Sequence, residues 1–258
     1  MGYGFVDVFN AIGGLVSDVF YKADPKKSDV KNYFDSIAKI LKDTQTKLDA
    51  LSKEQGGGDG GTQVVDAAKK ASEWIKEMHK AVDDTAKAGG EGGSDLIANV
   101  AAGGGANAGA GAKADAGSVT GIAKGMKAIV AAAGKAGVEL RAAAADAAGG
   151  GGAGGGNDAG KLFASGGNAH AGAGDDAQGA AEAAGKAVSA VSGDQILKAI
   201  VDAAGATEGK KANEAANAVE AAIGDDGAAG AAFAAGGMQN KNDQIAAAIV
   251  LRGLAKGG

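Results

Sequence analysis

The chain has 258 residues, of which 45% are hydrophobic and 48 are glycine, and it carries a formal net charge of −5 and no cysteine. Positive and negative residues are interspersed, which argues against a nucleic-acid-binding surface. A membrane-spanning helix needs about 18 consecutive apolar residues, and no apolar run in the chain approaches this length. Disulfide and thiol chemistry are excluded because cysteine is absent. Alanine supplies much of the hydrophobic fraction but buries little area, so the core must depend on sparse large side chains. Most aromatic residues lie within the first 74 positions, so we expect a firm core in the N-terminal quarter and looser packing in the middle.

The N-terminal third predicts three helices. Apolar residues recur at steps of three and four over 3–21, 28–55 and 62–88, which is typical of amphipathic helices. Ser28 is the expected N-cap of the second helix, and the glycine run 56–61 ends it. Because only this short loop separates the second and third helices, they should lie antiparallel as neighbours in a bundle.

The middle of the chain predicts weaker helices separated by glycine-rich loops. A short helix is expected over 94–100, and another should begin at Ser118 as its N-cap and continue to Val138 and Leu140. A brief turn should follow Asp158. Further weak helices are expected near 176–191, 194–204, 211–223 and 228–235, with loops at 103–117, 149–157, 165–176 and 224–227. The composition of residues 100–240 also leaves intrinsic disorder open as an alternative.

The last segment, from Asn242 to Gly258, is dense in large apolar residues. Asn242 or Asp243 can cap a helix that is apolar on both sides, so this helix should be enclosed in a bundle. We expect it to pack against helices 3–21, 28–55 and 62–88, and its arginine to reach solvent or pair with an acid near a loop. An exposed tail is the alternative. The residues assigned to this core helix are Asp243, Gln244, Ile245, Ile249, Val250, Leu251, Arg252 and Leu254, and replacing Ile249 by Asp should collapse thermal stability.

Sequence motifs do not indicate catalysis. The G-x-G-x-x-G match at 149–154 follows no predicted strand, and the Gly-Lys pairs lack the Ser/Thr of a phosphate-binding loop. His79 and His170 lie too far apart to indicate a zinc site, and the paired aspartates lack the spacing of a calcium loop. The sequence therefore predicts a protein that is not an enzyme and binds neither a cofactor nor a metal.

One segment indicates a family. Residues 238–256, and above all DQIAAAIVLRG at 243–253, resemble the characteristic segment of the variable large proteins of relapsing-fever spirochaetes, which are related to the variable surface antigen of Lyme-disease spirochaetes. The resemblance extends from Phe34 through the Ala/Gly-rich middle. The chain departs from the family in an extra residue before Asp243, in Leu254 where methionine is usual, and in Gly257-Gly258 where the family continues.

The resemblance implies an elongated all-α bundle with long antiparallel N-terminal helices, a buried C-terminal helix and glycine-rich distal loops. It implies one domain over 1–258, with a helical base at 1–88, variable helices and loops at 89–237, and the core helix at 238–258. The implied function is that of a lipid-anchored antigen of the outer membrane whose variation evades host antibodies. An adhesin that binds a host serum, matrix or cell-surface component through the distal loops is the alternative. We expect this chain to be a soluble form without the leader, the lipid-bearing cysteine and the last family helix.

Overall fold

The computed structural model describes residues 27–54, 61–89, 113–142, 156–163, 174–225 and 230–257. In chain order the elements are α2 (Lys27–Glu54), α3 (Gly61–Ala88), α4 (Ala116–Lys135), the 3₁₀ helix η2 (Asn157–Phe163), α5 (Gly174–Ser189), α6 (Gly193–Ala203), α7 (Ala218–Ile223) and α8 (Asn242–Leu254). These ranges contain no strand, so the all-α prediction is confirmed. The helices expected at 3–21 and 94–100 lie outside the described residues.

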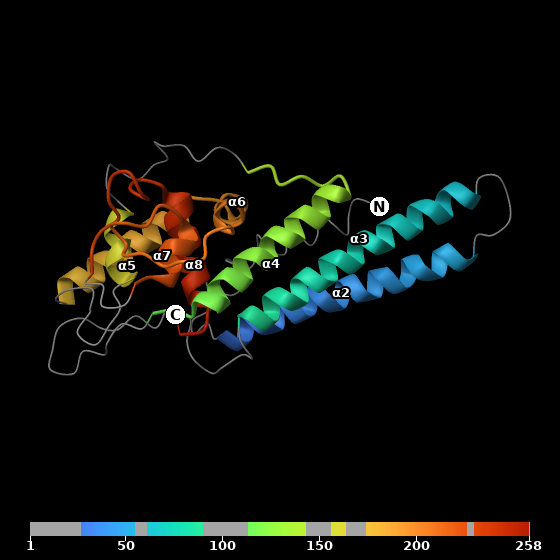
Figure 1. Ribbon diagram of the computed structural model, residues 1–258, viewed down its shortest axis with the longest axis horizontal. Coiled ribbons are helices and arrows are strands. Elements are labelled where there is room, and N and C mark those ends of the chain that lie inside the picture. Colours follow the sequence, from blue (N-terminus) through green and yellow to red (C-terminus); the bar gives the residue numbers. More distant parts are fainter. Residues whose placement is uncertain are drawn as a thin grey trace.

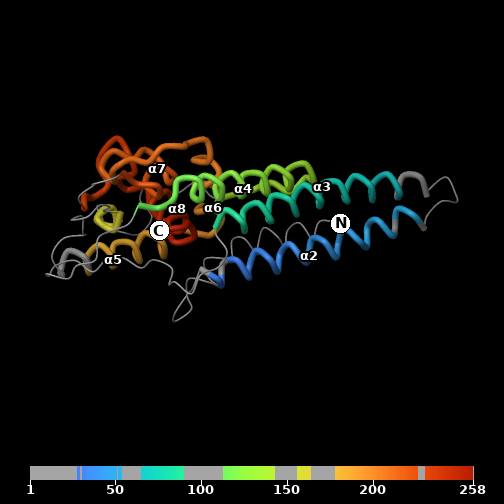
Figure 2. The backbone as a smooth tube through the Cα atoms, turned by 60° about the horizontal axis from the view of Figure 1, so that its bottom comes forward, coloured from blue at the N-terminus to red at the C-terminus, as the bar shows by residue number. Residues whose placement is uncertain are grey.

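The molecule is elongated (Figures 1 and 2). The α2–α3 hairpin extends toward one end, α4 lies along α3, and the remaining helices gather at the other end. The antiparallel arrangement of α2 and α3 is as predicted, and their bounds differ by only one residue from those expected. Because α2 begins at Lys27, Ser28 lies within the first turn and is not its N-cap.

The faces between α2 and α3 are built from the apolar stripes seen in the sequence. The large side chains on these faces are Phe34, Ile37 and Leu41 of α2 and Ile75, Met78 and Val82 of α3, each at most 4% exposed. On the outer surface, charged residues four positions apart form ion pairs, as between Lys31 and Asp35. These exposed pairs contribute little to stability, so the apolar faces hold the hairpin together.

Both ends of α4 differ from the sequence prediction. Asp115 is the N-cap, because its side chain accepts a hydrogen bond from the backbone N of Ser118 at 2.6 Å. At the other end, Gly137 adopts a φ of 82°, and the backbone N of Val138 donates to the carbonyl of Ala133 at 3.0 Å. This is a Schellman stop, which glycine favours because it lacks a Cβ. Val138 and Leu140 therefore follow the helix and are not part of it.

Helices α3 and α4 lie side by side (Figure 1), and two glycines of α4 bring them close together. A Cβ at Gly121 would lie 2.7 Å from the Cβ of Ala88, and a Cβ at Gly125 would lie 1.9 Å from Oγ1 of Thr85. Thr85 is buried and its hydroxyl already donates to the carbonyl of Ala81 at 2.7 Å. The contact therefore leaves no room for a larger residue.

The described part of the middle contributes many fully buried side chains to the core, although its composition led us to expect looser packing there. Among the largest fully buried side chains, only Phe34 and Met78 come from the N-terminal hairpin, and the rest lie at or after Ile122. Small residues between them allow helices to approach closely, so a few large side chains are covered completely.

Two of the weak helices differ from their predicted extents. The helix expected over 211–223 is confined to α7, because Asn217 caps it by accepting from the backbone N of Val219 and Glu220. Residues 230–235 are not helical. By contrast α6 begins close to where it was expected, with a reciprocal cap between Ser192 and Gln195.

Two glycines of α4 provide a matched test of the close α3–α4 contact. We expect Gly125→Ala to lower the free energy of unfolding by about 1–3 kcal/mol, because the new Cβ overlaps Thr85. Gly134 has no atom within 4 Å of its would-be Cβ, so Gly134→Ala should raise that free energy by about 0.5–1 kcal/mol. Urea unfolding of both variants measures the difference, and equal effects would contradict the close contact.

Candidate functional site around the C-terminal helix

The C-terminal helix α8 is surrounded by the Ala/Gly-rich part of the chain. Its main neighbours are α5, α6 and α7, followed by α4, while η2 and α2 each touch it at few points. The end of α3 reaches it near Gly89, whose would-be Cβ lies 3.5 Å from the carbonyl of Leu254. The expectation that α8 packs on helices 28–55 and 62–88 is therefore wrong for most of their length, and its expected contact with helix 3–21 lies outside the described residues. The hairpin lies on the far side of α4, which separates most of it from α8.

The structure places the predicted residues of this segment at different depths. Ile245, Val250, Leu251 and Leu254 are each at most 2% exposed, and so are the three alanines at 246–248. Ile249 is only partly buried. The set therefore splits into buried core positions and positions at the edge of the core.

The first turn of α8 differs from the predicted cap. Asp243 and Gln244 lie in this turn and are partly buried. The helix starts at Asn242, and Lys241 at the cap position makes no side-chain cap hydrogen bond, so neither Asn242 nor Asp243 is the N-cap. Asp243 still places a negative charge near the helix N-terminus, which is a favourable position.

Arg252 turns toward two other elements. Its guanidinium carbon lies 5.5 Å from the ring centroid of Phe163, and Nη1 donates to the carbonyl of Ala222 at 3.4 Å. Burial lowers the pKa of Arg252 to about 10, so the side chain remains charged at neutral pH. The Phe163 ring in turn packs against that of Phe233, with centroids 5.6 Å apart. The sequence raised solvent or an acid as the partner of Arg252, and it gave no signal for the ring or the carbonyl, because both contacts depend on the tertiary fold.

Ser118 joins three parts of the chain at the other end of α8. Its hydroxyl donates to the carbonyl of Ala88 and accepts from the backbone N of Lys256, the latter at 3.1 Å. The backbone N of Asp115 also donates to the carbonyl of Lys256 at 2.8 Å. We call these contacts the Ser118 junction. It ties the end of α3, the start of α4 and the segment after α8 together, and Ser118 is only 2% exposed there.

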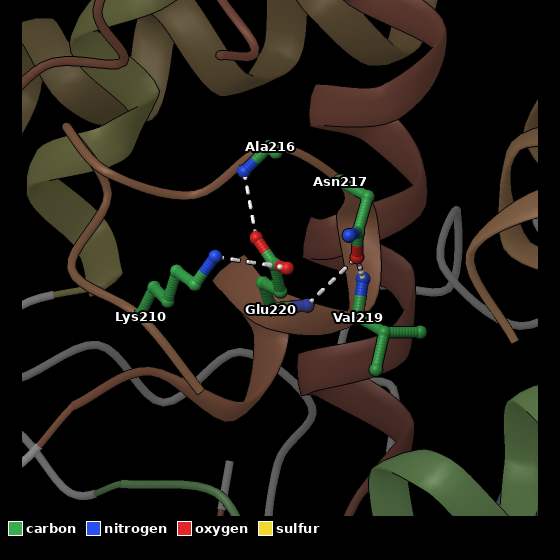
Figure 3. A network of polar contacts seen from close by, with 5 residues as sticks. All are labelled: Lys210, Ala216, Asn217, Val219 and Glu220. Atoms are coloured by element: carbon green, nitrogen blue, oxygen red, sulfur yellow. Dashed lines mark hydrogen bonds and ion pairs between the residues drawn. The ribbon is translucent and has the colours of Figure 1, made fainter. Parts of the chain in front are cut away.

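A polar network holds the segment before α7 (Figure 3). The carboxylate of Glu220 accepts from Nζ of Lys210 at 3.2 Å and from the backbone N of Ala216 at 2.8 Å, while Asn217 caps the same helix. The backbone N of Lys210 donates to the carbonyl of Glu220 at 3.0 Å. The two ends of the segment 210–220 are thus hydrogen-bonded to each other, and the segment is held against α7.

Two asparagines hold η2 against the segment before α8. Nδ2 of Asn157 donates to Oδ1 of Asn240 at 3.1 Å, and the backbone N of Asn240 donates to Oδ1 of Asn157 at 2.8 Å. Asn240 has a φ of 60°, a conformation that asparagine tolerates better than most residues. The backbone N of Phe233 completes the contact by donating to the carbonyl of Asn157 at 2.9 Å.

The described residues offer little reactive chemistry. In these parts of the chain no three His, Cys, Asp or Glu side chains lie close enough together to hold a metal ion. His79 lies 3.5 Å from a carboxylate oxygen of Asp83 on the outside of α3, and His170 lies outside the described residues. None of the described helices combines the length and apolar character needed to cross a membrane.

Comparison with known proteins decides the family. The model of the Borrelia lipoprotein family matches residues 5–258. This chain belongs to the Borrelia lipoprotein family. It is 33% identical to variable large protein 17 of Borrelia hermsii, in a match that covers 100% of this chain and 68% of that protein. Variable large protein 12 of the same organism is 31% identical over 54% of this chain and 39% of its own length.

A solved structure supports the same relationship. The variable surface antigen VlsE of Borrelia burgdorferi matches 100% of this Borrelia lipoprotein chain and 77% of its own, with a TM-score of 0.68 and 43% identity. The resemblance inferred from the DQIAAAIVLRG segment is confirmed. The names of these relatives describe variable large proteins and a surface antigen, not enzymes.

Two residues of α8 test how the helix is enclosed. We expect Leu251→Ala to lower the free energy of unfolding by about 2–5 kcal/mol, because it leaves a cavity at a fully buried position. Ile249→Ala should cost roughly half as much, because Ile249 is only partly buried. Denaturant unfolding of both variants gives the comparison. A larger loss at Ile249 would show that the wrong face of α8 has been assigned to the core.

The Ser118 junction can be tested against a neighbouring hydroxyl. Ser118→Ala leaves the backbone N of Lys256 without this acceptor, so we expect a loss of about 1–3 kcal/mol and faster amide exchange at Lys256. Thr120→Ala removes a hydroxyl that bonds only within α4, so stability should hardly change. Unchanged exchange at Lys256 in the Ser118 variant would argue against the junction.

Proposed function

We propose that this chain is an outer-surface lipoprotein antigen that serves antigenic variation and has no catalytic role. In this proposal N-terminal acyl chains hold the protein at the outer membrane. Sequence changes in the Ala/Gly-rich region then alter the epitopes to which existing host antibodies bind. Host antibodies and the membrane are therefore its main partners.

The names of the relatives are the first support. One is a variable surface antigen of known structure, at 43% identity over the whole of this chain. Another is a variable large protein aligned over the same full span. A family of lipoproteins also fits a protein that is anchored by lipid and displayed at a surface.

The single structural observation that carries the proposal is the enclosure of α8. The elements that surround it, namely α4, η2, α5, α6 and α7, form with it what we call the α8 framework. In the sequence, the stretches 143–155, 164–173 and 226–229 interrupt this framework and consist mainly of alanine and glycine. Because changes in connecting segments cost little conformational free energy, such stretches can vary while the framework stays folded.

The proposed domain organisation follows from the same observation. We keep the chain as one domain, with N-terminal helices at 1–88, an Ala/Gly-rich middle at 89–237 and the core helix at 238–258. The described elements of the middle belong to the framework, because they cover α8. Variation is then assigned to the stretches between these elements.

Exchange of loops between relatives tests the proposal. Residues 164–173 and 226–229 would be replaced by the aligned residues of variable large protein 17. We expect serum raised against the unchanged chain to lose most of its titre, while the melting temperature stays within about 3 °C because the framework is intact. The double substitution of Lys198 and Asp202 by Ala, on the exposed side of α6, is the control and should cost little titre. Equal titres for the original and the loop-exchanged proteins would contradict antigenic variation through these stretches.

Binding and surface assays separate this proposal from the adhesin alternative. If the protein is displayed at the surface, protease added to intact spirochaetes that carry it should remove it. A screen against purified host serum and matrix proteins should give no saturable partner. One saturable partner whose binding is lost with the exchanged stretches would favour the adhesin.

A further inference from the structure

The turn 211–216, which precedes α7, is held at several points although it is not helical. Ala215 is completely buried, and its backbone N donates to the carbonyl of Lys211 at 2.9 Å. The carboxylate of Glu220 accepts from the backbone N of Ala216 at 2.8 Å (Figure 3). A buried anchor and hydrogen bonds on both sides of it leave the backbone of this turn little freedom to move.

The turn 234–240, which precedes α8, is held in a similar way. Met238 is completely buried, and the backbone N of Gln239 donates to the carbonyl of Ala234 at 3.3 Å. The side chain of Asn157 makes two hydrogen bonds to the last residue of the turn. This turn is therefore anchored in the core and tied to η2.

The two turns touch each other through their backbones. A Cβ at Gly237 would lie only 2.4 Å from the carbonyl oxygen of Ala215, so only glycine allows this approach. We call 211–216 and 234–240 the paired turns. Their contact places two segments from different parts of the chain in one fixed arrangement.

The outer surface of the paired turns is polar. Asn213 and Glu214 are exposed in one turn, and Gln239 and Asn240 are exposed in the other. Neither turn exposes a large apolar side chain. Permanent protein interfaces are centred on buried apolar side chains, whereas antibody–antigen interfaces are more polar and contain more water. The paired turns therefore suit an antibody better than a permanent partner.

We propose that the paired turns form one discontinuous epitope, which is bound by a single antibody combining site. This inference rests on the proposed function, in which host antibodies are the main partners. Because the backbone of both turns is already ordered, binding requires little loss of conformational entropy. Exposed side chains of the turns can be exchanged without moving the buried anchors, so a substitution changes the epitope while the fold is kept.

Monoclonal antibodies raised against the folded chain test whether one antibody contacts both turns. The antibodies that bind Glu214→Lys at least about tenfold more weakly than the original would be selected first. Most of them should also bind Gln239→Lys about tenfold more weakly, because a long charged side chain then intrudes into the same contact surface. Glu182→Lys, a charge reversal at an exposed position of α5, is the control and should leave binding unchanged. Unchanged binding of the selected antibodies to Gln239→Lys would overturn the inference, because the turns would then be separate epitopes.

A matched pair of glycines tests whether the contact between the turns is needed. In Gly237→Ala the new Cβ forces the turns apart, so the selected antibodies should bind roughly tenfold more weakly. Gly205 has no atom within 4 Å of its would-be Cβ, so Gly205→Ala should bind as the original does. Full binding to Gly237→Ala would overturn the inference.

A peptide keeps the test decisive if Gly237→Ala does not fold. A synthetic peptide of residues 205–217 contains only one of the two turns and lacks its buried anchorage. We expect the selected antibodies to bind it at least about a hundredfold more weakly than the folded chain. Equal binding to the peptide and to the folded chain would overturn the inference.

Separate results bear on the paired turns and on antigenic variation. If no antibody to the folded chain depends on Glu214 or Gln239, the inference is overturned, and the loop-exchange titres still decide the proposed function. If those titres do not change, the proposed function fails, and binding to Glu214→Lys and Gln239→Lys still decides whether the turns form one epitope. A host protein that loses binding in both variants, while antibodies do not, would assign this surface to an adhesin and overturn the inference too.

Discussion

The structure depends on a C-terminal helix most of whose apolar residues are fully buried. Three alanines and four large apolar residues of α8 are almost completely buried, so other elements must cover this helix on nearly every side. The chain meets this requirement by packing α5, α6 and α7, which follow one another in the sequence, and part of α4 around α8. Their arrangement follows from the need to enclose α8, because a hydrophobic helix left exposed would be unfavourable in water.

Small side chains make this enclosure possible. An alanine buries little apolar area, but helices that meet through alanine and glycine can approach closely, and close approach gives many weak contacts. At Gly121 and Gly125 the backbone of α4 comes so near to α3 that no Cβ fits. The same long helix contacts α6, α7 and α8. Helix α4 therefore connects the N-terminal hairpin to the α8 framework, and the Ser118 junction fastens that connection at one end.

Local patterns in the sequence predicted most of the described helices, but they could not predict which helices contact each other. The stripes of α2 and α3 and the apolar density of 243–254 are local and strong, so helix extents and the choice of family followed from them. The sequence suggested Ser118 as the N-cap of α4, but Asp115 caps the helix. Both residue types are common N-caps, and the sequence does not show that the Ser118 hydroxyl instead donates to the carbonyl of Ala88. The stop at Gly137 had a readable signal, a glycine followed by an apolar residue. The partners of α8 and the ring that contacts Arg252 had no such signal, because these contacts join segments that are separate in the sequence and no local periodicity encodes them.

Native-state hydrogen exchange along α8 tests the central claim most directly. The backbone amides of residues 246–251 should exchange only through global unfolding, at rates far below those of the irregular segment 205–209. Their exchange should also slow in step with every substitution that stabilises the whole protein. Exchange in 246–251 as fast as that in 205–209 would show that α8 opens on its own, and the enclosure of this helix could not then organise the rest of the fold.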